Sequence, residues 1–600
     1  MLHGGNRIVM KSKVKVAILG GGIGGLCAAH ELAENGGELE IHVYEASDAL
    51  GGKARSQFLT GTGTGERFDL PGEHGFRFFP AWYNHIPDTM RRIPRSDGGT
   101  VLDNLVGCTE MGIAEMEAPQ VFRLKRHAPA SIGEFVDMAD LVVDFFAGAN
   151  LSLVDLGRFA IKMLEFLMTC EERRRDQYEE MSFFSFIEGA TFSRQFQSYL
   201  NSSRFMVAMD ARHGSACTMG NKVIQIMLDF WRAKGENDRV LRGPTRIQWL
   251  EPWETYLRDR GVVFHLGQAV KGFVLDAIGR RIVAAELSGG APPVIADHYI
   301  VALPIERMKP CISDQMALLD TSLLRLRRAR NMTAWMVGAQ YFLREDVPIC
   351  DGHVAYPDSP WALSSISQAS FWNRDKAGQE LFHNRYGNGS VKGVLSVDIC
   401  DWETPSPRLG KSARKCTSAE EVLAEVWEQL KEGVNGAAGQ VLLDSNLACW
   451  HLDENVTFSK DGAANVTPLL VHPPGSWFNR PGPVIAGIVN MFFAADYVQT
   501  ETDLATMEGA CHAARLAVNA LLAREGRPPA AAVFPVREEA GVLIKRAKER
   551  DRKAWLEERR APPPLVLRPG PFRGDEGPTI EDARRYQDRL KAALRALGPE

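Results

Sequence analysis

The chain has 600 residues, of which 45% are hydrophobic, 24% charged and 9% aromatic, and its formal net charge is -5. This length excludes a single small module, and the composition excludes a disordered or collagen-like chain. The small negative charge gives no electrostatic reason for binding to a phosphate backbone, so we expect no nucleic-acid partner.

The ten cysteines are scattered along the chain and form no CxxC pair. This spacing is typical neither of a disulfide framework nor of a zinc site, and we expect no metal. No apolar run reaches the roughly 20 residues that span a bilayer, and the start of the chain shows no signal-peptide pattern. We therefore expect a cytoplasmic protein, and we leave peripheral contact with a membrane open.

The first elements of the chain form a βαβ unit. They are a strand at residues 14–19, a helix at about 24–35 and a second strand at 39–44. Gly20, Gly22 and Gly25 form a GxGxxG motif at the first turn, and Glu45 ends the second strand. The glycines permit a tight turn, close approach of a pyrophosphate and close helix packing, while the helix N-terminus attracts phosphates. Because an acid in the position of Glu45 can bind a ribose, this pattern predicts a dinucleotide site.

The remaining elements alternate between two kinds of pattern. Residues 81–240 look mainly helical, with amphipathic rather than membrane-spanning runs at 141–146 and 159–168. Further predictions are a helix over 249–258, strands at 262–266, 273–277, 298–304, 336–343, 393–399 and 484–493, and a helix over 504–522.

The end of the chain changes in character. A highly charged helix is predicted over 538–560, followed by a Pro-rich linker and a final helix. Tyr586, Leu590, Leu594 and Leu597 form one apolar stripe on that final helix, which either docks on the body of the protein or contacts a second subunit.

A second glycine pair with two cations follows Glu45. It consists of Gly51, Gly52, Lys53 and Arg55. This stretch resembles the GG-x-x-R loop of the flavin-containing amine oxidase superfamily, which includes the carotenoid desaturases of the phytoene type. In that superfamily the loop runs along the FAD pyrophosphate. The alternative is that Lys53 and Arg55 are solvated loop charges.

Later segments carry the same resemblance. Residues 296–304 are similar to the A-D-x-V-V-x-A-x-P strand of the superfamily, and Val270 stands where a backbone contact to adenine is expected. Residues 490–496 and 505–510 resemble its L-F-x-A-G-D … A-T-M-E-G-A signature, with an alanine in place of the usual glycine. The resemblance implies that Asp496 meets the ribityl-phosphate part of FAD. It also implies that the following helix directs N–H groups toward the flavin edge that becomes negative on reduction.

Residues 68–79, followed by Pro80, end in an H-G-F-R-F-F-P stretch. This stretch resembles the part of the superfamily chain that passes over the flavin ring. Glu73, His74 and Arg77 are therefore candidates for a proton acceptor and a charge beside flavin N5. The alternative is that His74 and Arg77 pack on the flavin and pair with Glu73.

The predicted site consists of a catalytic set and an FAD-binding set. The predicted catalytic residues are His74, Glu73 and Arg77. The predicted FAD-binding residues are Gly20, Gly22, Ile23, Gly24, Gly25, Glu45, Ala46, Gly51, Gly52, Lys53, Arg55, Gly72, Glu73, His74, Val270, Asp496, Met507, Glu508 and Ala510.

The predicted fold is α/β, with a discontinuous Rossmann-like FAD-binding domain, an inserted α+β substrate domain and a C-terminal helical tail. The predicted parts are 12–80, 241–304 and 484–524 for the FAD-binding domain, 81–240 (helical) and 305–483 (sheet-containing) for the substrate domain, and 525–600 for the tail.

Two groups of residues are candidates for the substrate cavity. The first comprises Trp82, Tyr83, Trp335, Phe371 and Trp372, for which membership of the core is the alternative. The second is the polar cluster at 210–213, for which a buried ion pair is the alternative.

Three functions remain open. The first is an FAD-dependent desaturase or dehydrogenase that transfers a hydride from a C–H bond of a lipid or isoprenoid-like substrate, with a quinone or oxygen as electron acceptor. The second is an amine or amino-acid oxidase, for which Phe492 and Phe493 would be the nearest aromatic residues before Asp496. The third is a non-catalytic lipid-binding relative of the same fold. Assembly into a homo-oligomer is left open.

Overall fold

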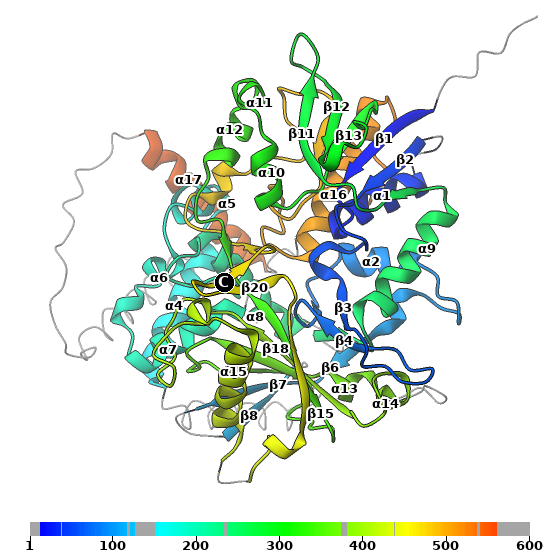
Figure 1. The fold of residues 1–600 in the computed structure, drawn as a ribbon. Coiled ribbons are helices and arrows are strands. Elements are labelled where there is room, and N and C mark those ends of the chain that lie inside the picture. The colour runs from blue at the N-terminus through cyan, green and yellow to red at the C-terminus, as the bar shows by residue number, and fades with distance from the viewer. Residues whose placement is uncertain are drawn as a thin grey trace, which may run out of the picture.

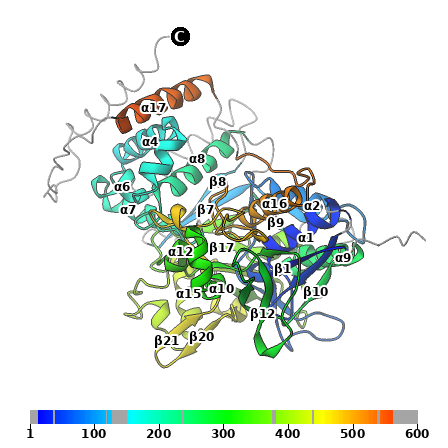
Figure 2. The same ribbon diagram turned by 90° about the horizontal axis from the view of Figure 1, so that it is seen from above.

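The structure is a computed structural model, and the residues it describes are 13–35, 37, 39–116, 120–126, 151–205, 207–232, 238–373, 381–436, 439–536 and 541–560. Figure 1 shows three main parts: a parallel sheet with its helices at the upper right, a large second sheet at the bottom and a group of helices at the left. Figure 2 shows from above that the group of helices lies to one side of both sheets.

The parallel sheet has the strand order β10-β2-β1-β13-β23, and every neighbouring pair in it is parallel. Its strands are β1 (Val14–Leu19), β2 (Leu39–Tyr44), β10 (Val263–His265), β13 (His298–Val301) and β23 (Met491–Phe493). The predicted strands at 14–19 and 39–44 are confirmed. Because the five strands come from three distant stretches of the chain, the sheet forms only when those stretches fold together.

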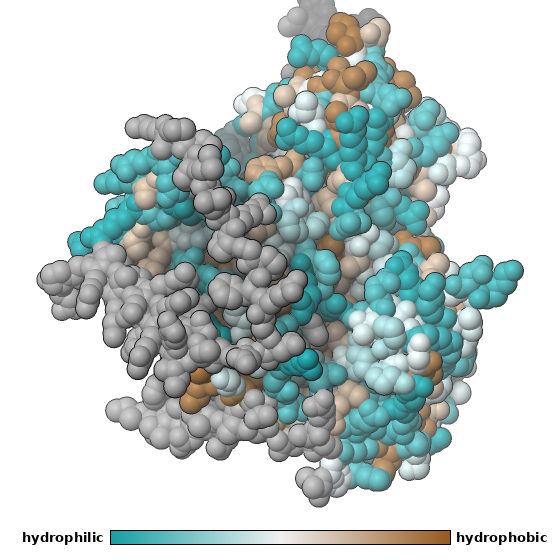
Figure 3. Space-filling model, turned by 90° about the vertical axis from the view of Figure 1, so that its left-hand side faces the viewer, coloured by the Kyte–Doolittle hydropathy of each residue, from teal (hydrophilic) through white to brown (hydrophobic). Residues whose placement is uncertain are grey.

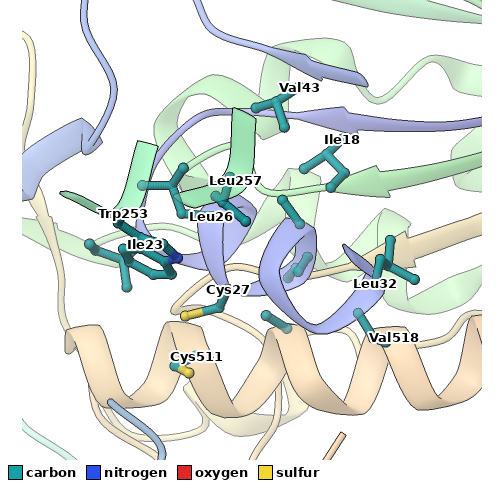
Figure 4. Close-up of a cluster of buried hydrophobic side chains, with 14 of the residues drawn as sticks. Ile18, Ile23, Leu26, Cys27, Leu32, Val43, Trp253, Leu257, Cys511 and Val518 are labelled. Atoms are coloured by element: carbon teal, nitrogen blue, oxygen red, sulfur yellow. The ribbon is translucent and has the colours of Figure 1, made fainter. Parts of the chain in front are cut away.

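Strand β1 contributes to two cores, because successive side chains of a strand point to opposite faces. Val16 and Ile18 belong to the core that contains α1 (Ile23–Asn35) and α16 (Met507–Arg524). Ala17 and Leu19 belong to the core on the other face of the sheet. Figure 4 shows the first core, in which α1 lies between the strands and α16.

Helix α1 approaches its neighbours too closely for side chains at two positions. A Cβ at Gly24 would lie 1.9 Å from the carbonyl oxygen of Ala494, and a Cβ at Gly25 would lie 1.9 Å from that of Gly20. Only glycine avoids both clashes. The close helix packing predicted from the third glycine of the motif is confirmed.

The second sheet has seven strands in the order β19-β15-β18-β17-β16-β7-β8. The strands are β7 (Glu110–Glu115), β8 (Gln120–Lys125), β15 (Val337–Leu343), β16 (His353–Ala355), β17 (Leu363–Ser367), β18 (Gly393–Ile399) and β19 (Leu447–Leu452). All pairs are antiparallel except β16 with β7. The predicted sheet in the middle of the chain is confirmed, and α15 (Ala419–Val434) packs against it.

The prediction that residues 81–240 are mainly helical is wrong over part of that range. It contains β6 (Leu105–Cys108), β7, β8 and the start of β9 (Asp238–Leu241). Strand β7 pairs with β16 more than 200 residues later, and β6 pairs with β9 more than 100 residues later. Such long-range pairing stabilises strands whose own sequence carries only a weak local signal.

The group of helices at the left of Figure 1 comprises α4 (Leu153–Met168), α5 (Glu171–Arg173), α6 (Phe183–Phe186), α7 (Arg194–Asn201) and α8 (Ala216–Arg232). Helix α4 contains the predicted amphipathic run at 159–168, whereas the run at 141–146 lies outside the described residues. Within the described ranges, no helix is both long and apolar enough to cross a membrane.

The last described element is α17 (Val542–Arg560), which confirms the charged helix predicted over 538–560. It docks on α4 and α5. Figure 3 shows the face of the molecule seen from the left of Figure 1, on which the coloured residues are mainly hydrophilic with scattered hydrophobic ones. The Pro-rich linker and the apolar stripe at 586–597 lie outside the described residues.

Two other predicted elements differ in extent. The apolar run at 484–493 forms a strand only over Met491–Phe493. The chain before this strand packs as a loop on the end of α11 (Asp314–Leu319), where a Cβ at Gly487 would lie 2.5 Å from the carbonyl oxygen of Leu319. Helix α16 begins at Met507 rather than at 504, since Thr506 caps it by accepting a hydrogen bond from Gly509 N–H.

The remaining helices and strands lie outside the two main sheets, and the strands form smaller sheets of two or three strands. The helices are α2 (His85–Arg92), α9 (Glu251–Asp259), α10 (Ile305–Cys311), α11 (Asp314–Leu319), α12 (Thr321–Arg328), α13 (Gln368–Trp372) and α14 (Phe382–Arg385). The strands are β3 (Ser56–Leu59), β4 (Leu70–Glu73), β5 (Phe78–Pro80), β11 (Val270–Leu275), β12 (Ile282–Leu287), β14 (Thr333–Ala334), β20 (Val456–Ser459), β21 (Gly462–Asn465) and β22 (Leu469–Leu470). The predicted helix over 249–258 corresponds to α9 and the helical turn before it.

Candidate active site

One cavity of about 1170 Å³ runs from the carboxyl ends of the parallel strands to the group of helices. The predicted site residues that line it are Gly20, Gly22, Ile23, Gly24, Glu45, Ala46, Gly51, Gly52, Lys53, Arg55, His74, Arg77, Val270, Asp496, Met507 and Ala510. The predicted residues that do not line it are Gly25, Gly72, Glu73 and Glu508. The sequence motifs therefore meet in one space, although they are up to about 490 residues apart.

The turn between β1 and α1 forms a cradle with free space for a ligand. Gly20 has a φ of +112°, and a Cβ there would lie 2.7 Å from the carbonyl oxygen of Ala302. At Gly22, the nearest atom to an added Cβ is Gly52 Cα at 3.8 Å, so the backbone is open to the cavity. The start of α1 follows directly and provides N–H groups and positive potential. This open turn fits the pyrophosphate of a dinucleotide.

Glu45 lies at the carboxyl end of β2 and faces the same cavity. Its carboxylate accepts hydrogen bonds from Gly21 N–H at 2.7 Å, and from the N–H and hydroxyl of Ser47 at 2.9 and 2.8 Å. These bonds fix the orientation of the carboxylate. Oε1 accepts both bonds from Ser47, while Oε2 accepts the bond from Gly21 and keeps further acceptor capacity. The position fits the predicted contact with a ribose hydroxyl.

The second glycine pair brings Lys53 close to Asp496 and Glu306. Lys53 Nζ lies 2.9 Å from the carboxylate of Glu306 and donates a hydrogen bond to the carbonyl oxygen of Pro468. Burial raises the pKa of Asp496, and the charge of Lys53 partly offsets this effect. Arg55 lies 3.7 Å from Asp48, whose side chain is exposed. Both predicted cations therefore line the cavity, and each has a carboxylate beside it. These carboxylates reduce the positive charge that a bound pyrophosphate would meet.

Glu508 does not face the cavity, contrary to its predicted place among the FAD-binding residues. It accepts hydrogen bonds from the N–H groups of Asn84, His85 and Ile86 and from the ring of His85, at 2.8 to 2.9 Å. Burial raises its pKa, but the bond and charge of His85 and the bonds from the backbone together outweigh burial and lower the pKa. Glu508 therefore caps the start of α2 and positions α16, while Met507 and Ala510 face the cavity.

Two further predicted residues also lie behind the cavity wall. Glu73 is buried and accepts hydrogen bonds from Ser56 Oγ at 2.8 Å and Thr245 N–H at 2.9 Å, and burial raises its pKa. Gly72 packs on His451, whose ring would lie 2.5 Å from an added Cβ. Neither residue lines the cavity, which argues against direct contact with a substrate. Glu73 Oε1 is taken by protein donors, while its buried Oε2 has no hydrogen-bond partner among the described residues.

His74 and Arg77 line the cavity, as expected from the resemblance. His74 Nδ1 forms a short contact with the carboxylate of Asp453, and its buried Nε2 has no hydrogen-bond partner. Burial raises the pKa of Asp453, but the bond and charge of His74, with the bonds from Asn455 and Gln57, together lower it to about 2. Arg77 donates a hydrogen bond to the carbonyl oxygen of Lys53 at 2.8 Å. His74 does not pair with Glu73; its carboxylate partner is Asp453.

Asp398 is a candidate site residue that the motifs did not reveal. It lies on β18, is almost fully buried and lines the cavity, and its Oδ1 has no hydrogen-bond partner. Burial raises its pKa to about 7, although the charge of Arg77 lowers it. A Cβ at Gly75 would lie 2.6 Å from Oδ1. The only signal in the sequence is a carboxylate within an otherwise apolar strand.

The far part of the cavity forms an apolar chamber. Its aromatic and aliphatic walls come from Phe159, Phe183, Phe196, Tyr199, Leu200, Phe205, Met219, Val223 and Ile226. Its polar groups include an ion pair between Arg126 and Asp238 at 2.7 Å, and His353, whose pKa burial lowers. These polar residues belong to segments that the sequence did not single out.

The candidate aromatic residues divide into two groups. Trp82 and Tyr83 line the cavity, whereas Trp335, Phe371 and Trp372 do not; the last two are buried in a core cluster. The cluster at 210–213 also lies outside the lining, and its Asp210 pairs with Arg204 at 3.0 Å. Asp210 therefore forms an ion pair, as the alternative predicted, but the pair is partly exposed rather than buried, and Asp210 also contacts His213 within the cluster.

A parallel sheet, an open glycine turn and an acid at the next strand end are the features of a dinucleotide-binding protein. Residues 23–522 match the family described as flavin containing amine oxidoreductase. Since this match covers most of the chain, the protein belongs to that family and is an FAD-dependent oxidoreductase. Membership favours the two enzymatic hypotheses over the non-catalytic one.

Solved structures with the same fold include several oxidases. The chain is similar to an oxidoreductase from Methanosarcina mazei, with 13% identity, a TM-score of 0.53 and coverage of 85% of this chain and 100% of the other. Cyclohexylamine oxidase from Brevibacterium oxydans is similar with 14% identity and a TM-score of 0.52, over 86% of this chain and 100% of the other. A protoporphyrinogen oxidase-like protein from Exiguobacterium sp. is similar with 14% identity and a TM-score of 0.53, over 86% of this chain and 100% of the other. A comparison with curated protein sequences gave no significant match. At these identities the likeness supports the fold and leaves the substrate open.

Proposed function

We propose that this protein is an FAD-dependent desaturase or dehydrogenase that removes a hydride from a C–H bond of a hydrophobic, lipid- or isoprenoid-like substrate. The observation that carries the proposal is the continuity of one cavity from the glycine cradle at Gly22 to the apolar walls at Phe159 and Phe196. An apolar chamber favours an apolar substrate, because burial of matching surfaces drives binding.

In this proposal the parallel sheet with α1 and α16 is the FAD-binding domain, built from parts within 12–80, 241–304 and 484–524. The group of helices and the seven-stranded sheet form the substrate domain, and α17 belongs to the tail. The support for this division is that the motifs of all three FAD-binding parts line one end of the cavity, while the apolar walls line the other.

The residues of the cradle have distinct proposed roles. Gly20, Gly22 and the start of α1 hold the pyrophosphate, and Glu45 accepts hydrogen bonds from the ribose. The N-terminus of α16, with Met507 at the cavity, stabilises negative charge on the flavin edge. When bound, FAD supplies the two-electron chemistry by accepting the hydride.

Asp398 and His74 are the proposed proton acceptors. In a desaturation, one hydrogen leaves its carbon as hydride, with the electron pair of the C–H bond. The neighbouring carbon loses a hydrogen as a proton. The electron pair of this second C–H bond then forms the double bond. Asp398 is suited to take this proton, since burial raises its pKa to about 7, and His74 Nε2 has no protein partner. Arg77 beside them provides a fixed positive charge.

We also propose a quinone or molecular oxygen as the electron acceptor. An apolar chamber suits a lipid-soluble quinone as well as a lipid-like substrate. Peripheral contact with a membrane would give access to both molecules and stays part of this proposal.

The second candidate function is the oxidation of amines. Membership of the family supports it, as does the similarity in fold to cyclohexylamine oxidase. Phe492 and Phe493 do not support an aromatic cage, since both are fully buried in the cores of the parallel sheet and neither lines the cavity. The apolar chamber therefore makes this function the second choice.

Anaerobic single-turnover experiments separate the two functions. The holoenzyme is mixed with an isoprenoid hydrocarbon such as phytoene or squalene, or with cyclohexylamine or putrescine, and the flavin absorbance is followed. We expect bleaching with an isoprenoid and none with the amines. Bleaching by amines alone, with hydrogen peroxide released on admission of oxygen, would replace the desaturase proposal by an amine oxidase.

A further inference from the structure

The side of the chamber formed by α8 contains one charged residue among apolar neighbours. Met219, Lys222, Val223 and Ile226 follow the i, i+3, i+4, i+7 spacing on α8, and all four line the cavity. Within the described parts of α4 and α6–α8, Lys222 is the one charged side chain that contributes to this lining.

Lys222 is buried, and no carboxylate of the described residues forms an ion pair with it. Its side chain is 1% exposed, and Nζ donates one hydrogen bond, to Gln225 Oε1 at 2.9 Å. Nζ also lies 4.7 Å from the centre of the Trp82 ring. An ammonium group has three N–H donors, so its hydrogen-bonding capacity is only partly used. Burial lowers the pKa of Lys222 to about 8, which leaves it mainly protonated at neutral pH.

The carboxylates whose charge acts on Lys222 are engaged by other groups. Asp503 forms ion pairs with Arg175 at 2.9 Å and with Arg480. Glu508 is held by His85 and three backbone N–H groups of α2. Neither forms an ion pair with Lys222, so the cation is available to a ligand in the chamber.

A buried cation without a counter-ion is costly, and a ligand carboxylate would remove this cost. The other cation of the far chamber wall, Arg126, is already paired with Asp238. A ligand with an apolar chain and one carboxylate therefore matches both the apolar walls of the chamber and the charge of Lys222, which is unpaired among the described residues.

We propose that Lys222 binds the carboxylate of an amphiphilic substrate whose apolar body lies along the aromatic walls of the chamber. This inference rests on the proposed function, in which the chamber holds a hydrophobic substrate. It narrows that substrate class to apolar chains or ring systems that carry an acid group.

The test compares two probes with the same carbon skeleton, oleic acid and oleyl alcohol. Their dissociation constants are measured with the oxidised holoenzyme, from perturbation of the flavin spectrum and of tryptophan fluorescence. We expect the acid to bind at least about tenfold more tightly than the alcohol. Lys222→Met should remove this preference and change the affinity for the alcohol less than about threefold, whereas Lys222→Arg should keep the preference.

Lys162→Met is the matched control. Lys162 is also buried and lies on α4, but it pairs with Glu165 at 3.2 Å and Glu188 at 2.9 Å and does not line the cavity. Its replacement should leave the preference for the acid unchanged.

Several results would overturn the inference. They are binding of neither probe, equal binding of both by the unchanged protein, or an acid preference that survives in Lys222→Met. A shift in the midpoint potential of bound flavin in Lys222→Met, with the acid preference retained, would show that Lys222 serves the cofactor. The binding experiment needs no turnover, so it is independent of the proposed hydride transfer. Failure of that transfer would appear in the single-turnover experiment, in which bound apolar substrates would not bleach the flavin.

Discussion

Gly22 is the position at which cofactor binding can be separated from folding. An added Cβ there meets no atom nearer than 3.8 Å, but it projects into the cavity where a pyrophosphate would lie. Gly22→Val should therefore yield folded protein with at least about tenfold less FAD, measured by extraction and absorbance.

Gly157→Ala is the control for this substitution, because nothing lies within 4 Å of an added Cβ at that position on α4. It should retain full FAD content. Equal FAD in the Gly22→Val protein and the control would contradict the placement of the pyrophosphate at this turn.

His74 is expected to affect the reaction more than cofactor binding. Its Nε2 is unpartnered at the cavity, and its Nδ1 is held by Asp453. His74→Ala should retain FAD and slow flavin reduction by roughly 10- to 1000-fold if the imidazole takes a proton. The check is single-turnover stopped flow, and an unchanged rate would leave His74 with a packing role alone.

Asp398 should make the stability of the apoprotein depend on pH. Its pKa is raised from 3.8 to about 7 by burial, so between these values the folded chain keeps a proton that the unfolded chain releases. Stability therefore falls as pH rises through this window. Asp398→Asn removes the effect and should stabilise the protein above pH 7 by on the order of 1–3 kcal/mol, with little difference near pH 4.

Thermal unfolding at several pH values provides the measurement for Asp398. Asp314→Asn is the control, since the side chain of Asp314 is 92% exposed. It should show no such pH-dependent difference from the unchanged protein. A stabilisation by Asp398→Asn that stays constant from pH 4 to 9 would contradict the raised pKa.

At the scale of elements, α17 is held on the helical group mainly by charge. Arg173 on α5 contacts Asp551 at 3.0 Å and Glu558 at 3.1 Å, and Arg552 contacts Glu172 at 2.7 Å. Partly exposed ion pairs contribute about 0.2–1 kcal/mol each and weaken as salt screens them. The attachment of this helix should therefore depend on salt.

Hydrogen exchange of residues 542–560 tests the attachment of α17. Exchange should accelerate as the ionic strength approaches about 1 M, where the Debye length is near 3 Å, and also in Arg173→Glu at low salt. Arg258→Glu, on α9, removes an ion pair with Glu254 elsewhere and should not affect α17. If the hydrogen-exchange rate of α17 changes neither with salt nor in Arg173→Glu, apolar contacts hold the helix instead.

The sequence predicted the elements whose signal is local. The strand at 14–19 is an apolar run bounded by a glycine turn, and its bounds agree with β1. The strands β6, β7 and β8 were missed. Strands β6 and β7 pair with strands more than 100 residues away, and β8 forms a hairpin with β7 that no periodic apolar pattern marks. The start of α16 shifted by three residues because the cap at Thr506, and not the apolar pattern, determines it.

At the scale of the whole molecule, the site combines motif residues with residues that only the tertiary structure brings in. Most of the cofactor residues predicted from motifs line the cavity, and they remain predictions until a cofactor is observed there. Asp398, Lys222 and His353 reach the same cavity from β18, α8 and β16, and no short motif connects them. Glu73 and Glu508 belong to motif segments, yet they bond to neighbouring backbone, and the spacing alone could not show which way they face.

The most direct test of the account is a titration of the apoprotein with FAD, followed by the flavin absorption bands and by quenching of flavin fluorescence. We predict saturation at one FAD per chain and a yellow protein that keeps the cofactor through gel filtration. A protein that stays colourless and leaves flavin fluorescence unchanged at excess FAD would contradict the placement of a flavin in this cavity, and with it the proposed hydride transfer.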